Sequence, residues 1–164
     1  MFVVDTNVFV EAANNRSPRH AECHAAVERW RGQPGPWHTT WGVIYEFMRV
    51  VTHPRVFERP WTWRQAWRFV EALLASPGFS PLVATARHAD IAAEVVRELP
   101  DLRGDILHDA HIAILMREHG LRRIYTQDAH FARFGFIEAV DPALPRPTAS
   151  EPASRYRARR PAGA

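Results

Sequence analysis

Short apolar segments rich in β-branched residues alternate along this chain with longer segments of helical periodicity. The first of them, FVVD at residues 2–5, ends in a carboxylate almost as soon as it begins. Alternation of this kind is typical of an α/β fold, in which helices cover both faces of a parallel sheet. We therefore expect the apolar segments to be buried strands and the longer segments to be the helices that connect them.

Start and stop signals delimit the expected helices. Ser17 and Pro18 are typical of a helix start, and this helix is expected to run to about Arg31. Thr62 is the expected N-cap of the helix WRQAWRFVEALLA, and Gly120 closes a helix that begins at residue 105. The other expected strands are residues 37–40, 81–84, 123–126 and 136–140, and the other helical segments are 41–51, 87–99 and 129–134.

Composition indicates one folded domain followed by a tail. The chain has 164 residues, and 46% of them are hydrophobic, which is typical of a globular protein. We expect a domain over residues 1–141 and a flexible extension over 142–164, where Pro, Ala, Ser and Arg predominate. The extension holds five of the 21 basic residues and one of the 18 acidic ones, so the net charge of +3 reflects the tail and not a basic domain surface.

Cysteine content and hydropathy indicate the compartment. Cys23 is the only cysteine, so no internal disulfide can form, and a reducing compartment fits best. No apolar run approaches membrane-spanning length, and no secretory signal pattern is present. We expect a cytoplasmic protein that does not associate with a membrane.

Four carboxylates occupy positions where burial is expected. Asp5 and Asp128 follow predicted strands, and ligands of open parallel sheets gather beyond the carboxyl ends of strands. Glu46 and Asp109 lie on helical faces whose neighbours three and four residues away are largely apolar. Purely structural roles are also open for each: an N-cap for Asp5, a turn cap for Asp128, an ion pair with Arg49 for Glu46, and contact with a neighbouring helix end for Asp109.

Convergence of these acids would require a cation. Carboxylates within a few ångströms repel one another, so that one must take up a proton or a divalent ion must bind. Hard oxygen ligands suit Mg²⁺ or Mn²⁺, whereas the nine His and the one Cys do not cluster at zinc spacing. An acid-only metal cluster is suited to phosphoryl chemistry, because the ions polarise the phosphate, activate a bound water and stabilise the leaving oxygen.

Three stretches and one helical acid together resemble a known family. FVVDTNVFV at residues 2–10, Glu46, LHDAHIAILMREHG at 107–120 and IYTQDAHFARFG at 124–135 resemble the PIN-domain nucleases, and specifically the VapC ribonuclease toxins of prokaryotic toxin–antitoxin pairs. The resemblance covers roughly residues 1–140. It implies a PIN-like three-layer α/β fold with a five-stranded parallel sheet.

The resemblance also implies a function. A member of this family would be a metal-dependent endoribonuclease that hydrolyses RNA phosphodiester bonds by metal-activated water, with Mg²⁺ or Mn²⁺ as cofactor, and would leave a 5′-phosphate and a 3′-hydroxyl. The expected partners are the RNA substrate, a cognate VapB-like antitoxin and a second copy of the chain.

Carried over by position, the resemblance names the residues of the site. Asp5, Glu46, Asp109 and Asp128 match the family's catalytic and metal-binding acids. Secondary candidates are Asn7, the early amide; Thr126, the hydroxyl at the end of the fourth strand; Asp105, which either reaches the ion through water or caps its helix; and His130. His130 stands where many relatives have another acid, which either weakens a second metal site or supplies a proton to the leaving group.

Two other functions and one surface feature stay open at this stage. His130 motivates a catalytically impaired PIN-like module that binds RNA or protein. A phosphatase or phosphotransferase with Asp5 as nucleophile is a weaker rival, because Asn7 occupies the place of a second Asp. Trp63 and Trp67 share a predicted helix face with Val70 and Leu74, so we expect them in the core, with an interface as the alternative.

Overall fold

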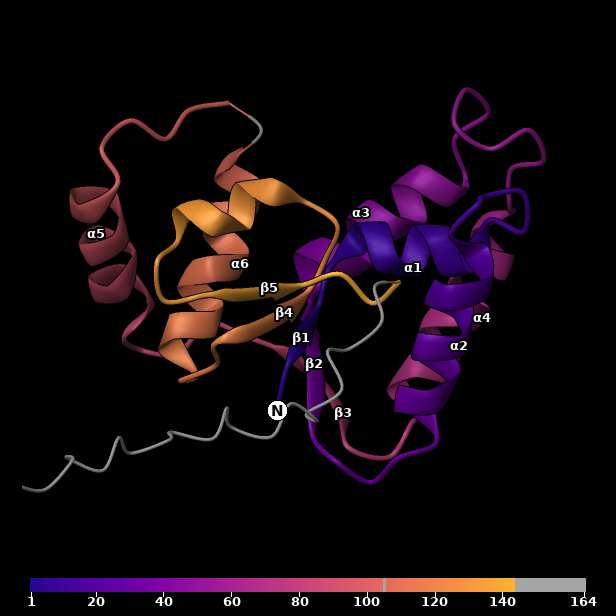
Figure 1. Ribbon diagram of the computed structural model, residues 1–164, viewed down its shortest axis with the longest axis horizontal. Helices are drawn as coiled ribbons and strands as arrows, with labels where there is room; N and C mark the ends of the chain where they lie inside the picture. The colour runs from indigo at the N-terminus through magenta and orange to yellow at the C-terminus, as the bar shows by residue number, and fades with distance from the viewer. Residues whose placement is uncertain (105, 144–164) are drawn as a thin grey trace, which may run out of the picture.

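Five parallel strands run through the middle of the molecule (Figure 1). The computed structural model describes residues 1–104 and 106–143. The strand order is β3-β2-β1-β4-β5, and every pair of neighbours is parallel. The strands are β1 (Val3–Val4), β2 (Trp37–Thr40), β3 (Phe79–Leu82), β4 (Arg123–Tyr125) and β5 (Glu138–Val140).

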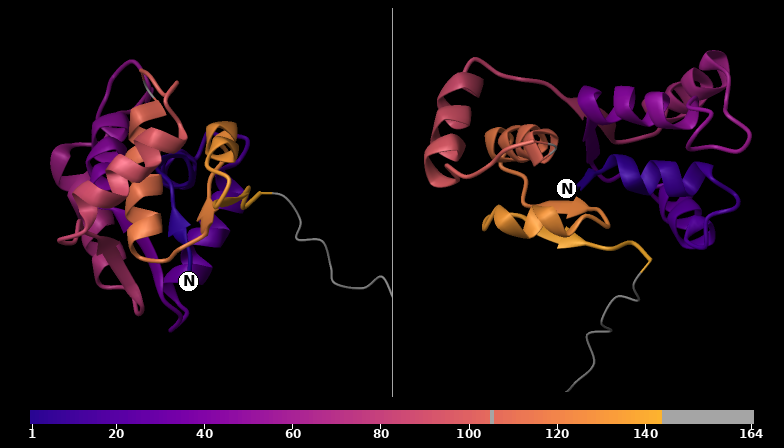
Figure 2. Two further views of the ribbon diagram at one scale, coloured as in Figure 1. Left: turned by 90° about the vertical axis from the view of Figure 1, so that its left-hand side faces the viewer. Right: turned by 90° about the horizontal axis from the view of Figure 1, so that it is seen from above.

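Helices cover both faces of the sheet. Four of them follow β1 and β2 and lie on one face, and the others follow β3 and β4 and lie on the opposite face (Figures 1 and 2). The first group is α1 (Thr6–Ala13), α2 (His20–Arg31), α3 (Trp41–Val51) and α4 (Trp63–Leu74). The second group is α5 (His88–Glu98), α6 (Ile106–Glu118) and the 3₁₀ helix η1 (Ala129–Arg133). The expected three-layer α/β fold is confirmed.

Strand order explains why the two groups lie on opposite faces. The chain moves outward from β1 to β2 and β3, and then returns across β1 to form β4 and β5. Right-handed crossovers put connections that move in opposite directions on opposite faces. The order therefore reverses between β1 and β4, at whose carboxyl ends an open α/β sheet leaves a crevice.

An aromatic cluster anchors the first group of helices to the sheet. Trp30 of α2 packs on Tyr125 of β4 with ring centroids 4.6 Å apart, and Trp37 of β2 packs on Phe79 of β3 at 4.4 Å. The two tryptophans are at most 1% exposed. Burial of each such ring contributes about 2 to 3 kcal/mol, so this cluster fixes α2 against strands that are themselves only a few residues long.

Several element boundaries differ from the predicted ones, and the strand expected over residues 136–140 covers only Glu138–Val140. Two further differences have a clear structural cause. The regular part of α2 begins at His20, not at Pro18, because the Ser17 hydroxyl accepts from the Arg19 N–H and donates to Glu11, so that an extra turn precedes the helix. Strand β3 covers residues 79–82 and not 81–84, since it pairs residue for residue with β2, whose last residue lies opposite Leu82. β3 is an edge strand, where a proline at position 81 is tolerated.

The prediction for the face of α4 was partly wrong. The buried residues of this helix are Ala66, Val70 and Leu73. Trp63 is 66% exposed and Leu74 38% exposed, because the apolar stripe that meets α3 is rotated by about one residue from the predicted one. Trp63 is therefore a surface residue.

Some predictions fall outside the described residues. Asp105 is one of them, and residues 144–164 of the predicted tail are the others, so the division into a domain and an extension stays a prediction. Among the helices that the structure describes, none is long and apolar enough to cross a membrane.

Gly78 provides a test of the turn that leads into β3. Its φ is +70°, and a Cβ there would clash with the Gly35 carbonyl oxygen, whereas Gly120, with φ +68°, has open space around it. We predict that Gly120→Ala lowers the free energy of unfolding by about 1 to 2 kcal/mol through backbone strain, and that Gly78→Ala lowers it by about 2 to 5 kcal/mol because the clash adds to the strain. Urea unfolding of both variants measures this, and equal losses would show that the close approach to Gly35 is absent.

Candidate active site

Asp5 stands at the point where β1 becomes α1. Its backbone N–H still continues the sheet, donating to the Tyr125 carbonyl at 3.0 Å, while its carboxylate Oδ1 accepts from the Thr6 N–H at 2.7 Å as the N-cap of α1. The capping role considered for Asp5 from the sequence is therefore real. It uses one carboxylate oxygen, and the other points toward β4.

Two side chains orient that second oxygen. Asp5 Oδ2 accepts from Asn7 Nδ2 and from Thr126 Oγ1, both at 2.7 Å. Asn7 Nδ2 also lies 2.9 Å from Thr126 Oγ1, and the Asn7 side-chain oxygen Oδ1 accepts from the Gln127 N–H at 3.1 Å. This network ties the start of α1 to the loop after β4, and it holds the Asp5 carboxylate in one orientation.

Asp128 caps the turn that follows β4. Its N–H donates to Thr126 Oγ1 at 2.9 Å, and its Oδ1 accepts from the His130 N–H at 2.8 Å. The cap starts η1 and directs the carboxylate toward α6, where Asp109 lies. The His130 ring reaches both acids, with Nδ1 3.3 Å from Asp128 Oδ1 and 3.7 Å from Asp109 Oδ2.

Glu46 approaches the site from the opposite group of helices. Its Oε2 accepts from Thr6 Oγ1 at 3.1 Å, and its Oε1 lies 3.6 Å from the Arg49 guanidinium. The ion pair that the sequence offered as an alternative therefore exists, yet Glu46 also contacts the residue next to Asp5. Thr6 was not predicted to take part, although a hydroxyl directly after the strand-end Asp was a visible signal.

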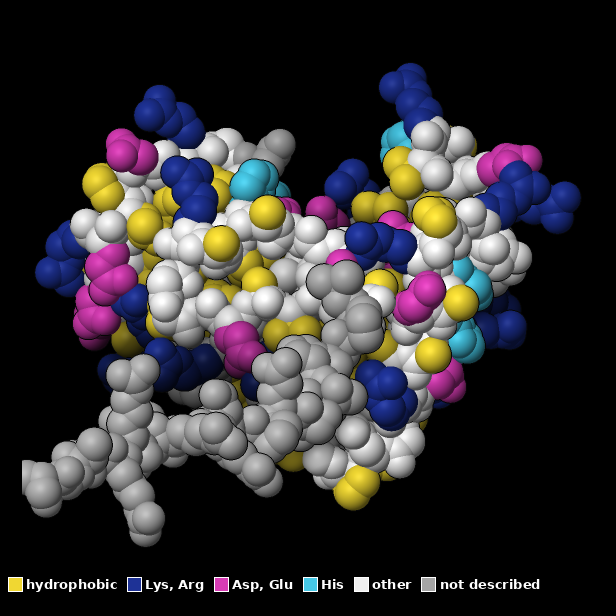
Figure 3. Space-filling model, in the orientation of Figure 1, with side chains coloured by type: hydrophobic (Ala, Val, Ile, Leu, Met, Phe, Trp, Pro, Cys, Tyr) yellow, Lys and Arg dark blue, Asp and Glu magenta, His cyan; other side chains and the backbone are white. Residues whose placement is uncertain are grey.

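One cavity of about 570 Å³ brings these side chains together. It is lined by Asp5, Thr6, Asn7, Val10, Glu11, Glu46, Arg49, Val50, His108, Asp109, Asp128 and His130. Asp5 and Asp128 come from the ends of β1 and β4, Glu46 from α3 on one face, and Asp109 from α6 on the other. Figure 3 shows this surface hollowed between the two groups of helices, with carboxylates in the hollow.

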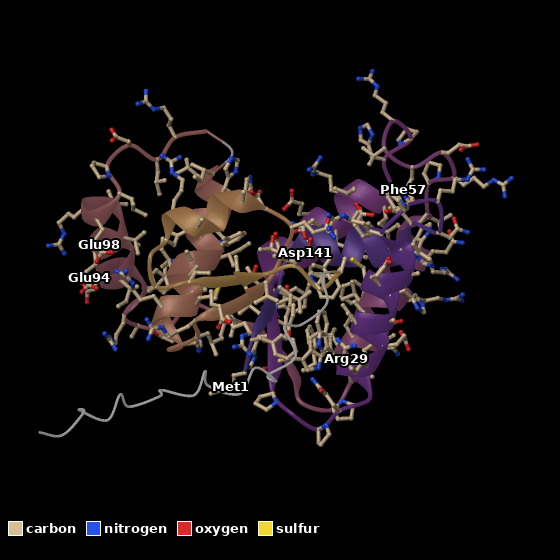
Figure 4. The ribbon with its side chains drawn as sticks, in the orientation of Figure 1. Met1, Arg29, Phe57, Glu94, Glu98 and Asp141 are labelled. Carbon is tan, nitrogen blue, oxygen red and sulfur yellow. The ribbon has the colours of Figure 1, made fainter. Side chains whose placement is uncertain are left out.

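Not every charged residue near the sheet belongs to this cavity. Asp141, after β5, is labelled near the middle of the molecule in Figure 4, but its carboxylate pairs with Arg19 at 2.6 Å and does not line the cavity. Glu98 of α5 likewise makes two hydrogen bonds with Arg117, at 2.8 and 2.7 Å, away from the acids. The hydrogen bonds of Asp141 and Glu98 are therefore structural links.

The electrostatics of the cavity are those of crowded negative charge. Burial raises the pKa of Asp5 to about 6, although hydrogen bonds from Thr126 and Thr6 oppose the shift and the charges of Glu46 and Asp128 add to it. Burial likewise raises the pKa of Asp109 to about 6, with repulsion from Asp128 and Asp5 as the next causes. At Asp5 and Asp109, burial and repulsion between acids thus outweigh the hydrogen bonds and the neighbouring His130 that oppose the shift.

The donor set fits a hard divalent cation. Among the described residues, one group of three potential ligands meets: Asp109, Asp128 and His130, whose donor atoms all lie within 4.8 Å of one another. Asp5 and Glu46 border the same cavity with further carboxylate oxygens. Oxygen donors in this number suit Mg²⁺ or Mn²⁺, and a bound cation would offset both the burial and the repulsion that raise the two pKa values.

Comparison with known proteins places the chain among nucleases of one family. The family model described as PIN domain matches residues 2–137. Ribonuclease VapC48 of Mycobacterium tuberculosis is 33% identical over 141 residues, which cover 84% of this chain and 94% of that protein. Ribonuclease VapC43 of the same organism is 34% identical over 134 residues, which cover 82% and 90% of the two chains.

Solved structures share the fold at lower identity. VapC20 of Mycobacterium tuberculosis, described as a toxin that cleaves the sarcin–ricin loop, superposes with a TM-score of 0.58 at 21% identity, covering 84% of this chain and 97% of that one. VapBC2 of Rickettsia felis, bound to a DNA fragment from its promoter, gives a TM-score of 0.60 at 15% identity, with 85% and 96% covered.

The raised pKa of Asp109 predicts an unusual pH dependence of stability. Because this pKa lies above the ordinary value of about 3.9, the folded state holds the proton more tightly than the unfolded state, and stability is lost as pH rises from about 4 through 6. In EDTA at pH 7.5, Asp109→Asn should therefore be more stable than the parent by about 1 to 3 kcal/mol.

Chemical denaturation between pH 4 and 8 checks this prediction. The gain should vanish near pH 4, where the parent carboxyl is protonated. Asp90→Asn, at an exposed position in α5, serves as the control and should change little at any pH. A gain of the same size at pH 4 and pH 7.5 would contradict the electrostatic explanation.

Proposed function

This chain belongs to the PIN-domain family and, within it, to the VapC ribonucleases, and on that premise we propose that it is a metal-dependent endoribonuclease and the toxin of a toxin–antitoxin pair. The resemblance read from the sequence is confirmed. The single observation that carries the proposed activity is the convergence of Asp5, Glu46, Asp109 and Asp128 on one cavity.

The four acids are proposed to hold Mg²⁺ or Mn²⁺. A bound ion would activate water for attack on phosphorus and polarise the scissile phosphate. Asn7 and Thr126 hold the Asp5 carboxylate in place, and Thr6 does the same for Glu46, so that these acids need little rearrangement to bind. The other two proposed ligands are Asp128, at the end of β4, and Asp109, which α6 brings from the opposite face of the sheet.

An RNA strand is the proposed substrate. The cavity is open at the surface, and Arg49 at its rim has a side chain 67% exposed. Its guanidinium lies 3.6 Å from Glu46, so we propose that it contacts a phosphate next to the scissile one and positions the strand without reading its sequence. Cleavage would leave a 5′-phosphate and a 3′-hydroxyl, as expected from the family resemblance.

The arrangement favours this reaction over the two rivals considered from the sequence. Asp5 is 6% exposed, and its carboxylate accepts three hydrogen bonds, from Thr6, Asn7 and Thr126, which suits a ligand better than a nucleophile that attacks phosphorus. An impaired binding module would have no need to keep Asp5 and Asp109 buried beside other acids, because this burial lowers stability.

A VapB-like antitoxin is the proposed protein partner. Two structural neighbours, from Rickettsia felis and from nontypeable Haemophilus influenzae, are VapBC assemblies, the latter with a TM-score of 0.59 at 15% identity over 87% of this chain and 98% of that one. We propose that the protein acts in the cytoplasm, where its RNA substrate is present.

Removal of one site charge tests the activity. Asp128→Asn keeps an oxygen that can accept from the His130 N–H, so the turn should survive while a charge is lost. We predict that this variant cleaves total bacterial RNA at least about a hundredfold more slowly than the parent in Mg²⁺ or Mn²⁺, and that EDTA abolishes cleavage by both. Sequencing of the new 5′ ends measures the rates.

The same assay includes a control variant and an outcome that would contradict the proposed activity. Asp90→Asn, outside the site, should cleave at the parental rate. Expression of the parent should arrest bacterial growth, whereas expression of Asp128→Asn should not. Undiminished hydrolysis by Asp128→Asn, or by the parent in EDTA, would exclude the proposed chemistry.

A homodimer is the proposed assembly, supported by exposed apolar side chains on the α3 and α4 side. Tyr45 is 58% exposed and Trp63 66% exposed, and the Tyr45 ring lies 5.9 Å from that of Trp41. Exposed aromatic residues of this size are typical of interfaces between copies of a chain.

Charge insertion tests the assembly. We predict that light scattering gives about twice the 18.8 kDa of one chain, and that Tyr45→Arg with Trp63→Arg gives monomers, because two buried charges would destabilise the interface. Val96→Arg, at a position 63% exposed on α5 across the sheet, is the matched control and should remain dimeric. A monomeric parent at micromolar concentration would contradict the proposal.

A further inference from the structure

His130 presents a nitrogen atom to the acids of the cavity. We propose that its imidazole is a ligand of the bound ion together with Asp109 and Asp128, and that this nitrogen makes the site prefer Mn²⁺ to Mg²⁺. The inference rests on the proposed metal-dependent function and adds a ligand beyond the four acids and a selectivity between the two ions.

The distances fit shared coordination. His130 Nδ1 lies 3.3 Å from Asp128 Oδ1 and 3.7 Å from Asp109 Oδ2, and one donor atom from each residue lies within 4.8 Å of the others. Donor atoms bound at about 2.1 Å to one ion lie no more than about 4.2 Å apart, so both separations to the nitrogen are within the span of a single coordination sphere.

The backbone around His130 is fixed while its ring is free to turn. The His130 N–H donates to Asp128 Oδ1, and the next residue, Phe131, is fully buried and anchors η1 to the core. The ring itself is 61% exposed, and the polar contacts recorded for it within the described part of the chain are those with Asp109 and Asp128. Binding to an ion would therefore break no other interaction.

Ligand chemistry gives the expected selectivity. Carboxylate and water oxygens serve Mg²⁺ and Mn²⁺ alike, whereas imidazole nitrogen suits transition-metal ions and is a poor ligand for Mg²⁺. An all-oxygen set would discriminate weakly between the two ions. Replacement of one oxygen by nitrogen shifts the balance toward Mn²⁺.

The competing explanation is a simple ion pair. A protonated imidazole next to two carboxylates gives the same distances without any ligand role, because an imidazolium has no free lone pair. The two explanations differ in the coordination of a bound ion. Only a His130 ligand places a nitrogen nucleus in the ion's coordination sphere.

Electron spin-echo spectroscopy of the full chain loaded with Mn²⁺ separates them. The parent should show the modulation of a directly bound ¹⁴N nucleus, and His130→Ala should lose it while it still binds Mn²⁺. His108→Ala is the matched control, because His108 is an exposed histidine that lines the same cavity next to Asp109. Its nitrogen signal should equal the parent's.

Competition titrations measure the selectivity. Mn²⁺ binding followed by the loss of the free-ion signal, repeated against Mg²⁺, should give a Mn²⁺ to Mg²⁺ affinity ratio at least about tenfold higher for the parent than for His130→Ala. His130→Asp restores an oxygen donor and should bind Mg²⁺ more tightly than the parent does.

The outcomes distinguish this inference from the proposed function. The role of His130 is overturned if the parent binds Mn²⁺ tightly without a nitrogen signal. It is also overturned if His108→Ala loses the signal and His130→Ala keeps it. In both cases the proposed nuclease function still stands. Absence of any Mn²⁺ or Mg²⁺ binding by the parent overturns both. The inference is supported if His130→Ala, and not His108→Ala, loses both the nitrogen signal and the selectivity for Mn²⁺.

Discussion

Repulsion among carboxylates at the carboxyl ends of β1 and β4 is the constraint on which the rest of the site depends. Asp5 and Asp109 both have a pKa near 6 because they are partly or fully removed from water beside other acids. A sequence would not keep this cost without a purpose, since neutral residues of similar size would be more stable. The neighbouring Thr6, Asn7 and Thr126 do not neutralise the charge. They orient it.

The topology of the sheet makes that concentration of charge possible. The order of strands reverses between β1 and β4, so the connections diverge to opposite faces and leave a crevice above the two strand ends. α3 carries Glu46 to the crevice from one face, and α6 carries Asp109 from the other. Each acid is thus supplied by a separate element of the fold. The aromatic contact between Trp30 and Tyr125 keeps α2 fixed to the sheet that carries the strand-end acids.

The observed structural roles and the proposed chemical roles fall on the same side chains. Asp5 caps α1 and Asp128 caps η1, and each turns its carboxylate toward the cavity in doing so. A cap is positioned by the backbone that it stabilises, which makes it a rigid point of attachment for a ligand. The cap that the sequence offered as an alternative is therefore present at both positions, and it is compatible with the proposed ligand role. The same turn at Asp128 determines where the His130 ring lies.

The sequence by itself determined the fold class and most element boundaries to within one or two residues, because periodicity, capping residues and glycines act over a few neighbouring positions. It also singled out the four acids that line the cavity, whose role as metal ligands is our proposal. It erred where a boundary depended on a partner: β3 is set by its pairing with β2, and Trp63 is exposed because of how α4 meets α3. Only the tertiary structure decided that Asn7 and Thr126 share the Asp5 carboxylate, and that the His130 nitrogen faces Asp109. These contacts join residues that strand order brings together from distant parts of the chain, and no local pattern encodes the distance between them.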